Sequence, residues 1–347
     1  MRSLPNVEKL KRKLIYFLLL SVALLFVGCD MKKNTAFNRK YQSINTRYNV
    51  YYNANESFKK GYKKLEESFS PDYSHIIPVF AVSDPSTEGV AKGDMTRTVE
   101  KCELAVQERS MQKKPKKKYE KMRDPAYVAF YNQEEFNTYM DEVWMLMGQA
   151  KFYSNDYLAA SATFTYVIKH FSGDDKLVLQ ASIWKARALK ELGWFYEAEE
   201  IMNKIEEEEL PADVVNLYQG ARADLYLAQK EYQQAMPHLL KAVETEKNRI
   251  QRTRFNFVIA QLYQMQGDKE KAYEYYDKVI KANPSYQMTF NANILQTEVV
   301  SGSSADLVKR LEKLAKNRNN ADYLDQIYYA MGNIYLSKGD TTKALAY

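Results

Sequence analysis

Three histidines, two cysteines and one run of glutamates are the side chains in this 347-residue sequence whose chemistry could support catalysis or metal binding. His75, His170 and His238 lie far apart, and none stands near a cysteine pair. The spacings of a zinc hydrolase, a paired-cysteine metal site or a phosphate-binding loop do not occur. The run from Glu206 to Glu209 lacks the alternating ligand spacing of calcium loops, which favours a solvated helix end. We therefore expect no catalytic residue, no metal site and no cofactor.

The first 28 residues have the pattern of an export signal. A basic stretch, KLKRK, precedes an apolar run from Leu14 to Val27, and a glycine and Cys29 follow. As a helix this run rises about 21 Å, which is short of the roughly 30 Å hydrocarbon core of a bilayer. Cleavage before Cys29 is therefore favoured over an uncleaved anchor. The stretch LFVGC resembles a bacterial lipobox, although Phe26 stands where leucine is commoner.

This interpretation predicts a lipoprotein signal peptide at 1–28 and a lipidated Cys29 with a tether at 29–37. Cys102 is then left without an intramolecular disulfide partner. In the stretch VEKCELAV it falls on the apolar face of a helix, so we expect a buried core thiol. The signal also carries most of the net charge of +6, since five basic residues face one acid there. The nearly neutral remainder gives no argument for binding nucleic acid.

Turn-like residues recur at regular intervals in the second part of the sequence. They stand at positions 155, 193, 230, 267 and 339, and the last, longer interval is two periods of 36 residues. The stretch SGSS at 301–304 falls where the missing turn belongs, between expected helices at about 286–300 and 305–317. Small residues recur on both sides of these turns, and we assign them to helix–helix packing: Gly148, Ala160, Ala186, Ala198, Ala223, Ala235, Ala260, Ala272, Gly332 and Ala344.

This pattern resembles the tetratricopeptide repeat over 134–347, in about six units of which the last is incomplete. Small residues let two antiparallel helices approach closely, and larger ones fill the space between successive pairs. The expected fold class is all-α, a right-handed α-solenoid of tetratricopeptide-like helix pairs with a concave surface. Because the last unit ends in its second helix, we expect the natural chain to continue beyond Tyr347.

The region between the signal and the repeats is predicted to be helical but less regular, over 38–111. We expect a long amphipathic helix at 38–68, an extended crossing through DYSHIIPVFAVSDPSTEGVAKGD, and a helix from about 95 to 111. A Lys/Pro-rich linker follows at 112–133. For its KKPKKK stretch, a solvated linker, an acidic protein partner, and a membrane or nucleic acid all stay open.

Several stretches resemble a periplasmic lipoprotein family of the Bacteroidetes. They are NTRYNVYYNANESFKKG (45–61), IIPVF (76–80), RDPAYVAFYNQEEFNTYMDEVWMLMGQAKF (123–152) and ELGWFYEAEEIM (191–202). The family is SprE/PorW of the type IX secretion system, which is tied to gliding motility in gliding species. The resemblance implies an outer-membrane, periplasm-facing, lipid-anchored scaffold without enzymatic activity. Its partners would be proteins of a secretion complex, with no nucleic acid and no small-molecule substrate.

The first helix of each repeat should line the concave face and expose its non-packing residues to a partner. No ring of lysine and asparagine that would clamp a terminal carboxylate is present, so we expect a broad folded or extended partner. The candidate partner-binding residues are Gln149, Phe152, Arg187, Lys190, Asp224, Phe257, Gln261, Gln264 and Asn333.

Two other classes of function stay open. One is a repeat lipoprotein of outer-membrane β-barrel assembly or of glycan uptake. Barrel-assembly lipoproteins carry repeats almost from the anchor, however, and glycan capture usually needs aromatic platforms on insertions that this array lacks. The other is a helical hydrolase, for which the sequence shows no catalytic constellation.

Replacing the predicted lipidation site should detach the protein from the membrane. In Cys29→Ser we expect an unlipidated protein that is uncleaved or soluble, because the thioether-linked chains supply the strong attachment. Metabolic lipid labelling combined with membrane fractionation measures both effects. Lipid label retained on the serine variant would contradict the lipobox interpretation.

Overall fold

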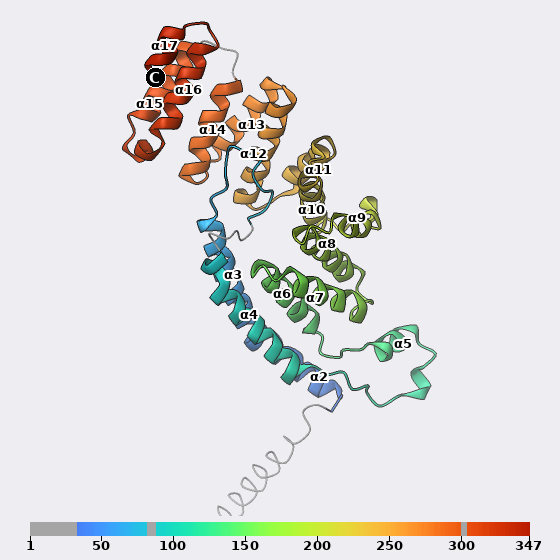
Figure 1. Cartoon of the computed structure of the whole chain (residues 1–347). Helices are drawn as coiled ribbons and strands as arrows, with labels where there is room; N and C mark the ends of the chain where they lie inside the picture. The colour runs from blue at the N-terminus through green and yellow to red at the C-terminus, as the bar shows by residue number, and fades with distance from the viewer. Residues whose placement is uncertain (1–32, 82–87, 300–303) are drawn as a thin grey trace, which may run out of the picture.

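The chain forms a curved stack of helix pairs with a long helical hairpin along its inner side (Figure 1). The computed structural model describes residues 33–81, 88–299 and 304–347, and every regular element in these ranges is helical. This confirms the all-α solenoid. The predicted signal peptide and Cys29 lie outside the described residues. None of the described helices is long and apolar enough to cross a bilayer.

The stack is built from successive helix pairs joined by short turns. Four pairs are regular, and their second helices pack closely on their first. The third-last α-helix, α15, packs more on α16 than on α14, so the unit predicted to be degenerate is the least regular. The helices of the stack are α6 (Met140–Tyr153), α7 (Tyr157–His170), α8 (Asp175–Glu191), α9 (Phe195–Asn203), α10 (Val215–Ala228), α11 (Tyr232–Thr245), α12 (Arg249–Gln266), α13 (Lys269–Lys281), α14 (Tyr286–Val299), α15 (Ser304–Ala315), α16 (Leu324–Leu336) and α17 (Thr341–Ala346), with short 3₁₀ turns at η4 (Glu207–Glu209) and η5 (Arg318–Tyr323).

The five predicted turns share one backbone geometry. The turn residue is left-handed at each, with φ between 62° and 81° at Asn155, Gly193, Lys230, Gly267 and Gly339. The N–H of the next residue donates to the carbonyl five positions back, at 2.8–3.1 Å in all five, which closes the first helix with a Schellman cap. At three turns this next residue is an aspartate whose side chain caps the second helix. The recurring Gly-Asp or Asn-Asp pair thus ends one helix and starts the next.

The small residues assigned to packing lie between paired helices. Those of the four regular pairs are buried, and most of the alanines have no exposed surface. At Gly148 an added Cβ would lie 2.5 Å from the ring of Phe164, so only glycine fits there. In the last pair, Gly332 and Ala344 are half-buried.

The N-terminal hairpin consists of two antiparallel arms. The first arm is one long helix made of α2 (Ala36–Asn45), a π-helical turn η2 (Thr46–Tyr51) and α3 (Tyr52–Ser68). The predicted helix at 38–68 is therefore confirmed. The second arm is α4 (Glu88–Arg109), and α3 and α4 pack along their length.

The predicted start of the second arm near residue 95 is wrong. The helix begins at Glu88 and includes Gly89 and Gly93, which belong to the stretch predicted as an extended crossing. Ala91 and Met95 are fully buried in the same cluster as Leu65, so packing outweighs the roughly 1 kcal/mol that each glycine costs a helix. 

Cys102 is a core thiol, as predicted. It is 1% exposed on α4 and packs with Ala54, Val143 and Met147. Burial raises the pKa of the Cys102 thiol to about 12, which keeps it protonated and unreactive at neutral pH.

The Lys/Pro-rich segment between the hairpin and the stack is largely exposed. It contains a 3₁₀ turn, η3 (Tyr119–Lys121), and a short helix, α5 (Pro125–Asn132), where only a linker was predicted. Asp124 caps this helix by accepting from the Ala126 N–H at 3.0 Å, and Pro125 occupies its first turn, where a missing N–H costs nothing.

A charge introduced between paired helices should destabilise the stack. We expect Ala235→Arg to lower the free energy of unfolding by roughly 3–5 kcal/mol, because Ala235 is fully buried and the new charge has no partner there. Gln234→Arg is the matched control, since the neighbouring side chain is exposed. Thermal melting measures both variants, and equal melting temperatures would mean that the packing register is wrong.

Candidate functional site: the concave groove and the segment within it

An extended segment of the chain itself lies on the concave surface of the stack. Residues 69–81, here called the crossing segment, leave the end of α3 and run across the first helices of the central repeats (Figure 1). The extended crossing predicted from the sequence is thus confirmed over 72–81. Its continuation at 82–87 lies outside the described residues.

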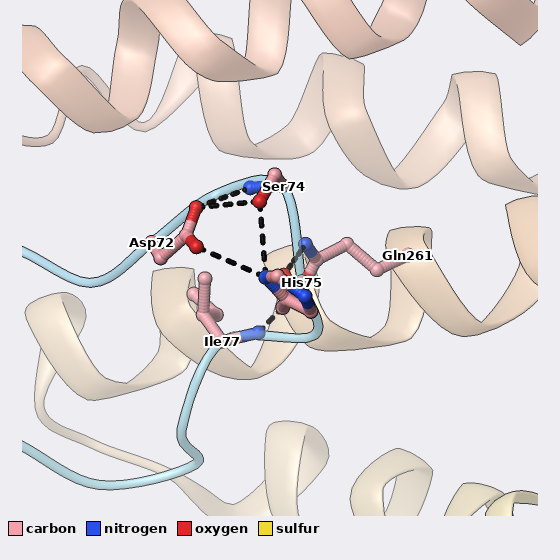
Figure 2. A network of polar contacts seen from close by, with 5 residues as sticks. All are labelled: Asp72, Ser74, His75, Ile77 and Gln261. Atoms are coloured by element: carbon pink, nitrogen blue, oxygen red, sulfur yellow. Dashed lines mark hydrogen bonds and ion pairs between the residues drawn. The ribbon is translucent and has the colours of Figure 1, made fainter.

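Two glutamines of α12 bind the backbone of the crossing segment. The Gln261 Oε1 accepts from the Ile77 N–H at 3.0 Å, and the Gln261 Nε2 donates to the His75 carbonyl at 2.6 Å (Figure 2). The Gln251 Nε2 donates to the Val79 carbonyl at 2.6 Å. These amides satisfy backbone groups that an extended chain cannot pair internally. This is how an extended peptide is recognised independently of its side chains.

The side chains of the crossing segment alternate between the groove and the solvent. Tyr73, Ile77 and Val79 are buried in one cluster with the core of α12, whereas Asp72 and Pro78 are exposed. Successive side chains of an extended chain point to opposite sides, so Ile77 and Val79 both enter the groove, whereas the turn before them leaves the side chain at position 75 exposed. The segment is therefore bound by both its backbone and its apolar side chains.

Aromatic contacts add specificity along the same surface. The ring of Tyr73 meets that of Phe257 edge-on, with centroids 5.2 Å apart, and Phe80 meets Phe255 at 6.2 Å. The ring of Phe80 packs directly against Gly220. A Cβ added at Gly220 would lie 2.8 Å from the Phe80 ring, so a larger residue does not fit there.

Two buried arginines stack on the ends of the crossing segment. The Arg187 guanidinium lies 4.1 Å from the ring centroids of both Phe80 and Trp184. The Arg254 guanidinium lies 4.5 Å from the ring of Phe69. Burial lowers the pKa of Arg254, and its Nε and Nη1 have no hydrogen-bond partner. Cation–π contacts with desolvated rings, worth about 2 kcal/mol each, offset part of this cost.

The predicted partner-binding residues are mostly covered in this state. Phe152 and Phe257 are fully buried, and Arg187, Asp224 and Gln261 are less than a tenth exposed.

The remaining predicted residues are paired, partly covered or exposed. Lys190 forms ion pairs with Asp224 at 2.8 Å and Glu191 at 2.5 Å. Gln264 accepts from the Tyr276 hydroxyl and donates to Glu298, Gln149 is half-buried, and Asn333 is exposed. A partner contact at these nine positions stays a prediction.

The groove continues beyond the crossing segment, toward the C-terminal repeats. There it is open, with a volume of about 490 Å³, between the start of the crossing segment and helices α14 and α16. Its lining includes three amides and three tyrosines and consists of Pro71, Asp72, Tyr73, Ser74, Gln287, Asn291, Ile294, Leu295, Glu298, Tyr323, Gln326, Tyr329 and Ala330.

Asp72, Ser74 and His75 contain the residue types of a hydrolase triad but not its geometry. Ser74 Oγ and Asp72 Oδ2 both approach the same imidazole nitrogen, Nδ1, at 3.0 and 2.9 Å (Figure 2). In a triad the serine and the aspartate bind opposite nitrogens of the ring. Asp72 Oδ1 also accepts from the N–H and hydroxyl of Ser74, and these bonds lower the pKa of Asp72. The group stabilises a turn.

His170 and the glutamate run also make structural contacts. His170 stacks on Tyr166 at the end of α7 and pairs with Glu134. In the glutamate run, Glu207 pairs with Lys241. In the part of the chain that the structure describes, no group of three or more His, Cys, Asp or Glu side chains could hold a metal ion.

The comparison with known proteins agrees with this geometry. The tetratricopeptide repeat family matches residues 253–286 and 325–347, which fall on α12–α13 and α16–α17. This chain is a tetratricopeptide-type helical protein. Its fold suits binding to other proteins and is typical of non-enzymatic interaction scaffolds.

Solved structures with a similar helical arrangement are distant in sequence. One is the apo form of the quorum sensor NprR from B. thuringiensis, at 15% identity and a TM-score of 0.49, covering 98% of this chain and 92% of that chain. Another is a tetratricopeptide repeat protein from Parabacteroides merdae, at 16% identity and a TM-score of 0.39, covering 85% and 90%. The sequence search among curated proteins gives no match.

Removing the glutamine clamp should loosen the crossing segment. In Gln261→Ala the Ile77 N–H and the His75 carbonyl lose their partner, which should cost about 1–3 kcal/mol because the site is buried. We expect faster chymotryptic cleavage after Phe80 and a lower melting temperature. Gln266→Ala, at an exposed position of the same helix, is the control. Cleavage at the wild-type rate in Gln261→Ala would show that the clamp does not hold the segment.

Proposed function

We propose that the chain is a lipid-anchored, non-enzymatic scaffold of the type IX protein secretion system, at the periplasmic face of the outer membrane. It holds components of the secretion machine together through its repeat surface, and in gliding species it serves gliding motility. The tetratricopeptide-type fold supports the interaction role. The resemblance of the N-terminal stretches to the SprE/PorW family supports the secretion role.

The observation that carries the proposal is the structural role of the stretch TRYNVYYN. Its first six residues form the π-helical turn η2, a feature that is rare and frequent at functional sites. Thr46 is fully buried and accepts from the Asn137 Nδ2 at 2.8 Å, and Tyr51 meets Tyr139 edge-on. The same amide of Asn137 also donates to the Arg109 carbonyl at 3.0 Å.

This stretch therefore connects three parts of the chain: the first arm of the hairpin, the end of the second arm, and the residues directly before the first repeat. A plain repeat array has no such junction. The part of the sequence that is most distinctive of the family thus lies packed at the junction between the hairpin and the stack. A scaffold that presents several partners in fixed positions needs contacts of this kind between its parts.

The open part of the groove is the surface that we assign to a partner. The central part is occupied by the crossing segment, so a partner that enters it would first have to displace thirteen ordered residues. The open part between α14 and α16 needs no displacement. Gln326 and Tyr329 are exposed in this open part and offer a partner protein a hydrogen-bonding amide and an aromatic ring, which are common contacts at interfaces.

The test is recovery of partners with the full chain expressed in its native cell. We expect Gln326→Ala/Tyr329→Ala to lower the recovery of secretion-machine components after mild crosslinking by at least about fivefold. This is the reduction in affinity expected when one aromatic interface residue is truncated. Tyr273→Ala is the matched control, because Tyr273 is a partly exposed tyrosine on α13, away from the groove. Recovery of barrel-assembly or glycan-uptake components in place of secretion components would overturn the proposed function.

A further inference from the structure

The first arm of the hairpin carries an exposed apolar stripe. Its members are 41–73% exposed and follow one another at intervals of four, three, four and four residues, which places them on one face of the helix: Phe37, Tyr41, Ile44, Tyr48 and Tyr52. The stripe spans about 22 Å at 1.5 Å per residue. The opposite face is packed, since Gln42, Thr46 and Ala54 are buried.

The arm that carries the stripe is basic. From Lys33 to Asn55 the chain has Lys33, Arg39, Lys40 and Arg47 and no acidic residue. An apolar stripe of phenylalanine, isoleucine and tyrosine beside lysine and arginine is the composition of helices that lie in a membrane interface. Tyrosine suits that position because its ring is apolar and its hydroxyl reaches water.

A second basic surface lies at the same end of the molecule. Residues 113–123 contain six lysines and an arginine against one acid, and all seven cations are exposed. The Asn34 amide donates to the Lys113 carbonyl at 2.7 Å, and Arg39 lies 4.9 Å from the ring of Phe130. These contacts fix the Lys-rich segment beside the start of α2, and Figure 1 shows α2 and α5 at the same end.

We propose that this N-terminal end of the folded chain binds an anionic lipid bilayer, with the apolar stripe of α2–α3 in the interface and the Lys-rich segment on the headgroups. The inference goes beyond the proposed function, because it concerns how the folded chain lies on the bilayer and requires neither lipidation nor a secretion partner. Each lysine near an anionic surface contributes about 1 kcal/mol, so the two surfaces together supply a second attachment.

Charge and position favour a bilayer over other occupants. A second copy of the chain would bring two basic arms together, and like charges at a contact oppose association. The stripe begins eight residues after Cys29 and ten after Val27. A bilayer that holds either the lipid predicted on Cys29 or the uncleaved apolar run would therefore lie within about 35 Å of the arm. An acidic protein surface meets the charge requirement but not this proximity.

The test uses the full chain with Cys29→Ser and one reporter cysteine, since Cys102 is buried. An environment-sensitive fluorophore at Asn49→Cys reports on the stripe, and one at Tyr119→Cys reports on the Lys-rich segment. A third, at Tyr329→Cys, reports on the far end. The labelled protein is titrated with vesicles of phosphatidylcholine alone and with vesicles that contain a quarter phosphatidylglycerol. Insertion of the apolar run should be the same in both kinds of vesicle, so a difference between them reports the effect of lipid charge.

We expect the reporters at 49 and 119, but not at 329, to move to a less polar environment on the anionic vesicles, and the response to vanish at high salt. Lys116→Gln/Lys117→Gln/Lys118→Gln should weaken the response at least tenfold. Lys309→Gln/Lys313→Gln/Lys316→Gln removes the same charge from exposed positions at the other end and should leave it unchanged.

An equal response on both kinds of vesicle would overturn the inference, because the apolar run would then account for it. The inference would also be overturned if the reporters responded to soluble polyglutamate but not to anionic vesicles. That result would assign the surface to an acidic protein partner. Tyr41→Ser/Tyr48→Ser must reduce the response at 49; a wild-type response there would exclude the stripe from the contact.

Discussion

The bonds between the Gln261 amide and the backbone of residues 75 and 77 connect the two halves of this molecule. They fix an extended segment on the concave surface, and the segment in turn ties the hairpin to the central repeats. A solenoid repeat contacts mainly its neighbours. Here the crossing segment contacts α8, α10 and α12, the first helices of three successive repeats, and so links repeats that are not adjacent. The central part of the concave groove is thus filled by the chain's own crossing segment. Only the part beyond that segment is open to another protein.

Much of the solenoid could be predicted from the sequence because its signals are local. Asn155, Gly193, Gly267 and Gly339 mark their turns because asparagine and glycine tolerate a left-handed backbone. The turn at Lys230 followed only from the period of the repeat and its flanking small residues. The helix at 38–68 followed from its amphipathic spacing. The start of α4 could not be predicted, because Gly89 and Gly93 read as helix breakers and the packing of Ala91 that outweighs them is long-range.

The candidate site could be predicted only in part, for the same physical reason. Gln261 was placed on the concave face by its register in the repeat, and it lies there. That its amide binds the chain's own backbone depends on a contact between residues 184 positions apart, which no local pattern encodes. The helix breakers in the stretch DYSHIIPVFAVSDPSTEGVAKGD predicted an extended crossing. Which of its side chains are buried, and against which helix, is visible only in the folded chain.

The most direct test of an occupied groove is hydrogen exchange of the Ile77 amide in the unmodified chain. This account predicts protection within about tenfold of that of the core amides of α12, because the amide is buried and opens only when the segment leaves the groove. Exchange near the rate of an unstructured peptide would contradict it. The central groove would then be open to partners, and the covered residues, Arg187, Phe257 and Gln261 among them, would be available for binding.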